Sequence, residues 1–369
     1  MNGVIMDVEK NTTFYQQRHR LTIRQIAELR EFSGIAIPQI SDQPRKIDTM
    51  AKVAELIRLS KMFKAHNLEF ISIKGPLLSW RLHQDVAVRY TNDLDILVKP
   101  EDLFIIIRML KEDGYQTTHF DLPASGSKKR LLLKLNNHIG LMHPQKKILL
   151  EVHWRLMKPE VCSKTKLDQL INQNTESVIF HNESFTVFTK EFELVYLILH
   201  GAMHEWFRLK WLHDIVSFSK DEQLDWDRVF ELNKDFHGEH LVYQAIQLAD
   251  KFWDLPPDVA ARFAAENMDL NAFMINHPLK SISRTNVATI EPGFYNWLSF
   301  VNGTVKYGLM LFPSAKYKYT FLKRLMFREI DMKILKLPDF LTFMYFPLRP
   351  FLIVYSRLVP SSTRNHRAE

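Results

Sequence analysis

The sequence predicts an α+β protein in which a short sheet is flanked by helices. Short runs of strand-forming residues lie between positions 70 and 154, apolar residues recur at helical spacing before and after them, and Gly or Pro residues separate the runs. The 369 residues are enough for two domains or one elaborated domain, and 46% hydrophobic with 25% charged residues is typical of a globular protein.

Helices are predicted ahead of the first strand. Apolar residues at helical spacing run from Arg24 to Phe32 and from Ile47 to His66. The residues of the second helix expected to pack beside the first strand are Met50, Val53, Ile57 and Leu59. We therefore predict that residues 1–66 form a helical segment that packs on the core. Residues 1–20 lack the basic and then apolar pattern of a signal peptide, which argues against export.

The most informative stretch joins two strands through a glycine turn. Phe70–Ile73 is predicted to be a strand, Gly75-Pro76 a turn into a helix, and Asp93–Val98 a second strand. Because side chains alternate along a strand, Asp93 and Asp95 project from one face while the intervening apolar residues anchor the other. An Asp-x-Asp pair alone is also common at a solvated strand end, so its meaning depends on its neighbours.

Two carboxylates on one strand attract a counter-charge. A hard divalent cation such as Mg²⁺ takes oxygen ligands and leaves positions for substrate phosphates. The Lys74-Gly75 turn is suited to binding these phosphates, because backbone N–H groups point outward at a helix N-terminus and glycine permits close approach of a phosphate. Arg89 could add a charge-assisted contact to the same phosphates.

Glu151 is the third candidate acid. The segment from Arg130 to Trp154 is predicted to be a hairpin, with strand-forming residues from Leu131 to Met142, a polar turn at 144–147 and a returning strand from Ile148. Such a hairpin can bring Glu151 beside the Asp pair. The alternative is an acid at a strand edge that pairs with Lys146 or Lys147.

The later elements are predicted to be helical. Pro100-Glu101-Asp102 begins a helix that reaches Asp113 and ends at Gly114, and successive helices run from Lys190 to Trp253 until Pro256-Pro257. We predict a core at 67–188, a helical domain at 189–300 and a C-terminal helical segment at 301–369.

Together these motifs resemble a known family. The Lys74-Gly75 turn is followed by R-x3-D-L-D-I-L-V, then by the E-V-H-W strand, then by H-G-A-M-H-E-W-F-R-L-K-W-L-H-D-I from His200 to Ile215. This order is similar to that of the uncharacterised bacterial nucleotidyltransferase family of the DNA polymerase beta-like superfamily. The resemblance covers about Lys74 to Ile215.

The resemblance implies a minimal nucleotidyltransferase fold, a short mixed sheet flanked by helices. It also implies transfer of a nucleoside monophosphate from an NTP to an acceptor, with release of pyrophosphate and with Mg²⁺, or alternatively Mn²⁺, as cofactor. By position, Asp93 and Asp95 match the catalytic, metal-binding aspartates and Glu151 the third acid. The superfamily has Gly-Ser at the phosphate turn, whereas this chain has Gly75-Pro76, so Lys74 is the candidate to replace the missing hydroxyl contact.

The segment from His200 to Ile215 permits two interpretations. His200 and His204 share a helix face and could bind zinc, but a packing or hydrogen-bonding role is the better prediction. Cys162 is the single cysteine, which excludes a disulfide within the chain and thiolate-rich zinc sites. Arg208 and Lys210 could bind triphosphate from a helix over the cleft, or they could form a solvated basic face.

The C-terminal segment carries the excess positive charge. Residues 301–369 contain twelve Lys or Arg and four Asp or Glu, a net charge of +8, while residues 1–300 have a net charge of −1. The apolar stretch from Phe340 to Val359 is interrupted by Pro and Arg, so we reject a transmembrane helix. The segment could pack as a helical core, form a lid with a cationic rim, or lie on an anionic membrane surface. No recognisable RNA or DNA module accompanies the charge.

Two classes of function follow. The favoured hypothesis is a Mg²⁺-dependent nucleotidyltransferase in which Asp93 and Asp95 bind metal and Glu151 completes the metal site or serves as base. In this hypothesis the substrate-binding residues are Lys74, Gly75, Arg89, Arg208 and Lys210. The alternative is a non-catalytic nucleotide-binding protein whose basic C-terminal segment docks a membrane surface or a partner. We expect a cytoplasmic protein, with peripheral contact at the inner membrane surface as an open alternative. The acceptor (small molecule, glycan, peptide or RNA) and the preferred base are not encoded in a readable motif.

Overall fold

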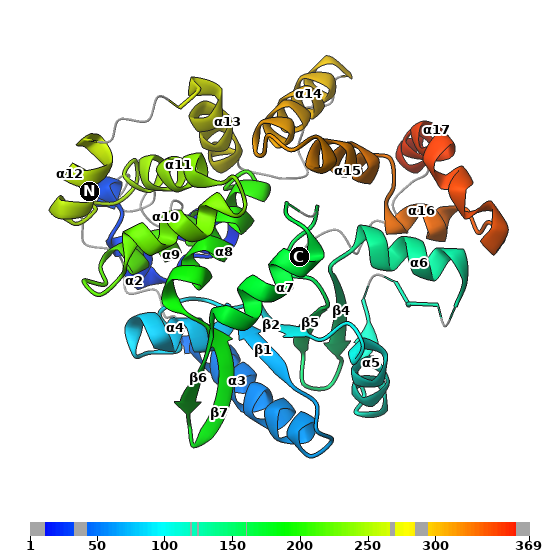
Figure 1. Cartoon of the computed structure of the whole chain (residues 1–369), viewed down its shortest axis with the longest axis horizontal. Coiled ribbons are helices and arrows are strands. Elements are labelled where there is room, and N and C mark those ends of the chain that lie inside the picture. Colours follow the sequence, from blue (N-terminus) through cyan, green and yellow to red (C-terminus); the bar gives the residue numbers. More distant parts are fainter. Residues whose placement is uncertain are drawn as a thin grey trace, which may run out of the picture.

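The computed structural model is an α+β fold with one central sheet and helices on both faces (Figure 1). The structure describes residues 12–32, 43–118, 120–123, 125–159, 161–265, 270–284 and 294–358. Residues 1–11 and 33–42 of the predicted N-terminal segment lie outside the described residues, as does the end of the basic segment, residues 359–369.

The sheet has seven short strands in the order β3-β4-β5-β2-β1-β7-β6. The strands are β1 (Phe70–Ile73), β2 (Asp93–Val98), β3 (Gln116–Thr117), β4 (His138–His143), β5 (Ile148–His153), β6 (Thr175–Phe180) and β7 (Glu183–Phe188). The sheet is mixed, because β2 pairs in parallel with β5 and antiparallel with β1. The predicted fold class is therefore confirmed.

Two helices cover one face of the sheet. These are α3 (Gln43–Lys64) and α5 (Leu103–Glu112), and their apolar residues share a core with β2 and β5. Leu94 and Ile96 of β2 and Leu150 and Val152 of β5 point into this core. This burial fixes which face of each strand is apolar and so leaves the alternate residues for the opposite face.

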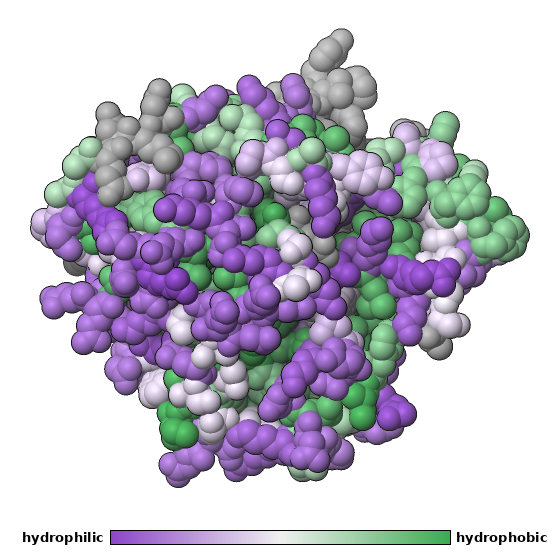
Figure 2. Space-filling model, viewed as in Figure 1, coloured by the Kyte–Doolittle hydropathy of each residue, from purple (hydrophilic) through white to green (hydrophobic). Residues whose placement is uncertain are grey.

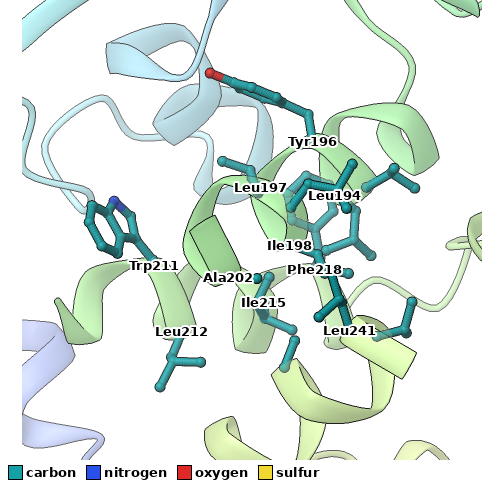
Figure 3. Packing of buried hydrophobic residues seen from close by; sticks show 14 of the residues in the cluster. Leu194, Tyr196, Leu197, Ile198, Ala202, Trp211, Leu212, Ile215, Phe218 and Leu241 are labelled. Carbon is teal, nitrogen blue, oxygen red and sulfur yellow. The ribbon is translucent and has the colours of Figure 1, made fainter. Parts of the chain in front are cut away.

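The opposite face of the sheet meets a helical layer. Its helices are α4 (Gly75–His83), α8 (Lys190–Met203), α9 (Leu209–Ser219), α10 (Trp226–Lys234) and α11 (Glu239–Ala249). Apolar side chains of α8, α9 and α11 pack together around Ile198 and Ile215, and Tyr196 of α8 belongs to the same cluster (Figure 3). The N-terminal α2 (Ile23–Ala27) and η1 (Arg30–Phe32) pack on this layer through Ile26 and Leu29.

The remaining helices are α6 (Gly126–Leu135), α7 (Lys164–Gln173), α12 (Pro257–Ala265), α13 (Ala272–Ser283), α14 (Phe294–Met310), α15 (Ala315–Leu325), α16 (Glu329–Ile334), η2 (Asp339–Met344) and α17 (Tyr345–Leu358). The last three lie beside α6 (Figure 1) and share a small core with it. Asp339 accepts hydrogen bonds from the backbone N–H groups of Ser127 and Lys128 and so caps α6. Part of the C-terminal segment therefore packs as a helical core.

Most predicted elements are confirmed, with two corrections. The turn at 144–147 and the strand from Ile148 are present, but residues 131–135 belong to α6 and the first hairpin strand begins only at His138. Leu132 and Leu135 pack against the C-terminal helices, and a segment of apolar residues alone cannot distinguish such a helix from a strand. Met50 was expected to pack on the first strand, yet its side chain is exposed because it lies on the solvent side of α3. No described helix is long and apolar enough to cross a membrane.

Candidate active site

Asp93 and Asp95 lie on the face of β2 that meets the helical layer. The intervening Leu94 is buried in the opposite core, so the alternation predicted for this strand is present. Asp95 is buried, while Asp93, at the strand end, is partly exposed. The carboxylate of Asp95 lies 4.0 Å from the ammonium of Lys74 and accepts a hydrogen bond from the ring of His153 at 3.0 Å.

Glu151 lies directly beside Asp95. The parallel register of β2 and β5 places the two residues opposite each other, on the same face of the sheet. Lys146, one of the two alternative partners predicted for Glu151, pairs instead with Glu55 and Asp113. The sheet therefore brings the three predicted acids together.

Two histidines flank Glu151. Nε2 of His153 lies 3.3 Å from the Glu151 carboxylate, and Nε2 of His138, on β4, lies 3.7 Å from it. Burial would raise the pKa of Glu151, but His138 and His153 outweigh burial and hold this pKa below its ordinary value. Burial would lower the pKa of His153, but its hydrogen bonds to Asp95 and Glu151 raise it above the ordinary value.

Lys74 occupies an unusual position ahead of α4. Its backbone has a φ of +57°, which side chains other than glycine rarely adopt. Its side chain is buried, and its ammonium lies 3.4 Å from Nδ1 of His200 and 5.1 Å from the centre of the Tyr196 ring. Burial would lower the pKa of Lys74, but Tyr196 and Asp95 outweigh it and leave this pKa above its ordinary value. The ammonium therefore supplies a fixed positive charge beside Asp95.

Gly75 opens a space at the N-terminus of α4. Its φ is +65°, and a Cβ built on it would meet no protein atom within 4 Å. The free N–H groups of the first turn of α4 lie at this end of the helix, and Pro76 occupies a position where no N–H is needed. This is the geometry expected for close approach of a phosphate.

Arg89 is engaged in a buried ion pair. Its Nε and Nη2 donate to the carboxylate of Asp214 on α9 at 2.7 and 3.0 Å, and the Arg89 side chain is only 2% exposed. This pair joins the segment before β2 to the helical layer. A direct contact between Arg89 and phosphate stays a prediction that requires this pair to loosen.

Lys210 is the buried cation that faces the acids. Burial and the nearby charge of Arg89 lower its pKa to about 7, although the Asp93 charge opposes them. In the part of the chain that the structure describes, the ammonium of Lys210 has no hydrogen-bond or ion-pair partner. Arg208, at the start of α9, is only partly exposed and lies against the rings of Phe207 and Trp211. A solvated basic face is therefore wrong for Lys210.

His200 and His204 contact each other and an aromatic neighbour. Their ring centres are 4.5 Å apart, and each lies 5.3 Å from the ring of Trp211. Within the described ranges, the cluster with the spacing of metal ligands consists of His138, Glu151 and His153 and does not include this pair. Both rings pack against Trp211 and His200 contacts Lys74, and the packing role of the two histidines stays a prediction.

Sequence reasoning missed several residues of this site. His153 follows Glu151 by two positions and so shares its strand face, a signal that was available in the E-V-H-W motif. His138 required the hairpin register, which pairs it with His153. Asp214 lies 125 residues from Arg89, so no local pattern could have linked them.

Three acids on neighbouring strands beside a strand, glycine turn and helix define a nucleotidyltransferase-like protein. The comparison with protein families agrees, because residues 45–254, more than half of the chain, match the family model described as uncharacterised nucleotidyltransferase. The chain therefore belongs to this family, and the predicted resemblance is confirmed.

Individual proteins show only low similarity to this chain. A crystal structure of an antigenic nucleotidyltransferase-like protein from Paracoccidioides brasiliensis is similar with a TM-score of 0.36 and 14% identity, covering 60% of this chain and 93% of that chain. The search of curated proteins found no match.

Proposed function

We propose that this protein is a Mg²⁺-dependent nucleotidyltransferase that moves an NMP from an NTP to an acceptor and releases pyrophosphate. The observation that carries the proposal is the register of β2 and β5, which sets Glu151 beside Asp95, and Asp95 lies 4.0 Å from Lys74, the residue ahead of the Gly75 turn. Family membership supports the same class of reaction.

The donor set suits a hard divalent ion. Asp93, Asp95 and Glu151 offer carboxylate oxygens, which are the ligands that Mg²⁺ and Mn²⁺ prefer. When bound there, a divalent ion would neutralise phosphate charge and lower the pKa of an attacking hydroxyl.

The other residues bind and orient the triphosphate. The first turn of α4 presents N–H groups to a phosphate at Gly75, and Lys210 supplies a buried positive charge when it is protonated, a state that a bound phosphate would favour. Lys74 lies deeper, against Asp95 and His200, so its main contribution is to hold the Asp95 carboxylate in place. Gly75-Pro76 can serve without the usual serine, because the backbone supplies the phosphate contacts.

The first experiment measures label transfer from NTPs labelled at the α phosphate, with Mg²⁺ and an extract of metabolites and macromolecules as the source of acceptor. Asp95→Asn should lower transfer by roughly 100-fold or more, since such metal interactions contribute several kcal/mol. Asp168→Asn is the matched control, because Asp168 is an exposed carboxylate on α7. Transfer that is equal in wild type and Asp95→Asn would contradict the proposal.

The same experiment addresses the alternative function. A nucleotide-binding protein without catalysis predicts NTP binding in calorimetry but neither label transfer nor pyrophosphate release. Asp95→Asn would then weaken binding in the presence of Mg²⁺ without changing a reaction.

We also propose that the C-terminal segment contacts an anionic membrane surface. Phe340, Phe343, Phe351 and Tyr355 are all more than half exposed, although large aromatic side chains are usually covered. Hydrophobic side chains gather over α17 at the right-hand end of the molecule in Figure 2. Arg130 and Lys134 of α6 line a hollow of about 290 Å³ together with Phe340 and Phe343. Aromatic and basic side chains on one surface fit an interface with acidic lipids.

Co-sedimentation with vesicles tests this contact. Wild-type protein should bind vesicles that contain phosphatidylglycerol and should bind pure phosphatidylcholine vesicles weakly. Phe340→Ser with Phe343→Ser should release it, whereas Ile179→Ser, which removes an equally exposed apolar side chain on β6, should not. Binding that is unchanged by the paired substitution would overturn the proposal.

A further inference from the structure

Side chains beside the acid pair form a second cluster with metal-ligand spacing. His138 of β4 and Glu151 and His153 of β5 each offer one ligand atom, and these atoms all lie within 4.8 Å of one another. The separations of 3.3 and 3.7 Å between the carboxylate and the two ring nitrogens are close to the roughly 3.0 to 3.5 Å between neighbouring ligands of an ion bound at about 2.1 Å. The antiparallel register that pairs His138 with His153 holds the rings on adjacent strands.

Asn137 fixes the state of His138. The oxygen of the Asn137 amide lies 3.3 Å from Nδ1 of His138 and can only accept, so Nδ1 carries the proton of the neutral ring. Nε2 is then without a proton, and its lone pair faces the Glu151 carboxylate. Two electron-rich atoms repel each other unless a proton or a metal ion lies between them, and a metal ion can hold both atoms at once. A ligating histidine that donates its other ring N–H to a protein oxygen is the usual arrangement in metal sites.

The neighbouring His153 faces the same gap. Its Nε2 lies 3.0 Å from Asp95 and 3.3 Å from Glu151, so two carboxylate oxygens converge on one ring nitrogen. A proton holds this position in the absence of metal. Nδ1 of His153 lies 3.4 Å from Nδ2 of the Asn137 amide, which is a donor, so metal ligation by His153 requires this contact to break when the ring proton moves to Nδ1.

We propose that His138, Glu151 and His153 bind a first-row transition ion, separately from the Mg²⁺ position at Asp93 and Asp95. Two imidazole nitrogens with one carboxylate suit Zn²⁺ and Mn²⁺, whereas Mg²⁺ takes oxygen ligands almost exclusively. Three protein ligands also leave an open position for water or a substrate oxygen. The inference deepens the proposed function, with which it shares Glu151, by assigning the class of the second ion.

Mn²⁺ binding to the full chain tests the assignment, because pulsed EPR detects imidazole nitrogen coupled to bound Mn²⁺. Wild type should bind Mn²⁺ with a ¹⁴N coupling and should bind Zn²⁺ in competition with a chromophoric chelator. His138→Gln should remove or halve the coupling and weaken Zn²⁺ at least about tenfold. The His138 side chain is partly exposed, so this variant should fold. His181→Gln, which changes an exposed histidine at the β6–β7 turn, is the control.

Failure of this inference is distinguishable from failure of the proposed function. Mn²⁺ bound without nitrogen coupling, Zn²⁺ affinity unchanged in His138→Gln, or no binding of either ion would each overturn the transition-metal site. Label transfer with Mg²⁺ would nevertheless support the transferase. Conversely, nitrogen-coupled Mn²⁺ without label transfer would support the metal site and contradict the transferase function. If both proposals are correct, Asp93→Asn should abolish transfer and leave the nitrogen coupling in place.

Discussion

The two faces of strands β2 and β5 carry opposite kinds of residue. The face toward α3 and α5 presents Leu94, Ile96, Leu150 and Val152, none of them more than 1% exposed. The face toward α8 and α9 presents Asp93, Asp95, Glu151 and His153. Because side chains alternate, a slip of one residue would exchange the faces, so burial of the apolar set also fixes where the carboxylates lie. The apolar face therefore determines the geometry of the chemical face.

The strongest test moves a charge from one face to the other. Ile96→Asp places a carboxylate without a partner in the core, and we expect it to lower the free energy of unfolding by more than about 4 kcal/mol. Asp95→Asn, one residue away, should cost less than Ile96→Asp, because Asn retains an oxygen that can accept from His153, although Lys74 loses the carboxylate 4.0 Å away. Denaturant unfolding followed by circular dichroism measures both variants. Equal stability of the two would show that the faces are not distinct.

Charge on the polar face should be tolerated only when it is paired. Asp214→Asn leaves the Arg89 guanidinium buried without its counter-charge, and loss of one partner of a buried pair costs about 3–5 kcal/mol of unfolding free energy. Asp168→Asn, an exposed carboxylate, should change stability by less than about 0.5 kcal/mol. A small effect of Asp214→Asn would mean that water reaches Arg89 easily.

Lys210, unlike Arg89, is buried without an ion-pair partner among the described residues. The free energy needed to bury its charge should appear as a pH dependence of the unfolding free energy. The pKa is about 7 in the folded protein and 10.5 as the ordinary value, so between these pH values the unfolded chain binds more protons. Stability should therefore rise with pH in this window, by up to about 1.4 kcal/mol per pH unit from this residue. The difference in unfolding free energy between wild type and Lys210→Met isolates the slope. A difference that is independent of pH would contradict the lowered pKa.

The smallest expected effect on stability is at the glycine turn. Gly75→Ala should cost about 1–2 kcal/mol, because alanine disfavours a φ of +65°, while its methyl group enters the open space and weakens NTP binding. Gly126→Ala is a control at a φ of +94° that also meets Asp339, so it should lose stability without losing nucleotide affinity. Calorimetry with NTP and Mg²⁺ separates the two effects. Unchanged nucleotide affinity in Gly75→Ala would mean that the phosphate does not bind at this turn.

The sequence predicted the elements whose pattern is local. Alternation identified β2 and placed Asp93 and Asp95 on one face, and the flanking Pro and Gly marked α5. The family's motifs supplied Glu151 as the third acid, and the sheet register brings it beside Asp95. The roles of these residues stay predictions until transfer is measured.

What could not be predicted depends on distant contacts. Leu132 and Leu135 gave no sign that they face helices almost two hundred residues later, so their segment was assigned to a strand. The pairing of Arg89 with Asp214 likewise joins residues far apart in the chain, and burial, not charge, determines that Arg89 is engaged. His138 could be assigned to the site only from the register of the β4–β5 hairpin, which the sequence does not specify.

The ion pair between Arg89 and Asp214 has a consequence for how a ligand enters. It bridges the segment before β2 and the helix α9, so separating the sheet from the helical layer would expose two charges that are now matched. The two halves of the site are therefore assembled before any nucleotide arrives. Binding energy need not be used to bring the two together, so a nucleotide that binds at the Gly75 turn should meet a site that is already preorganised.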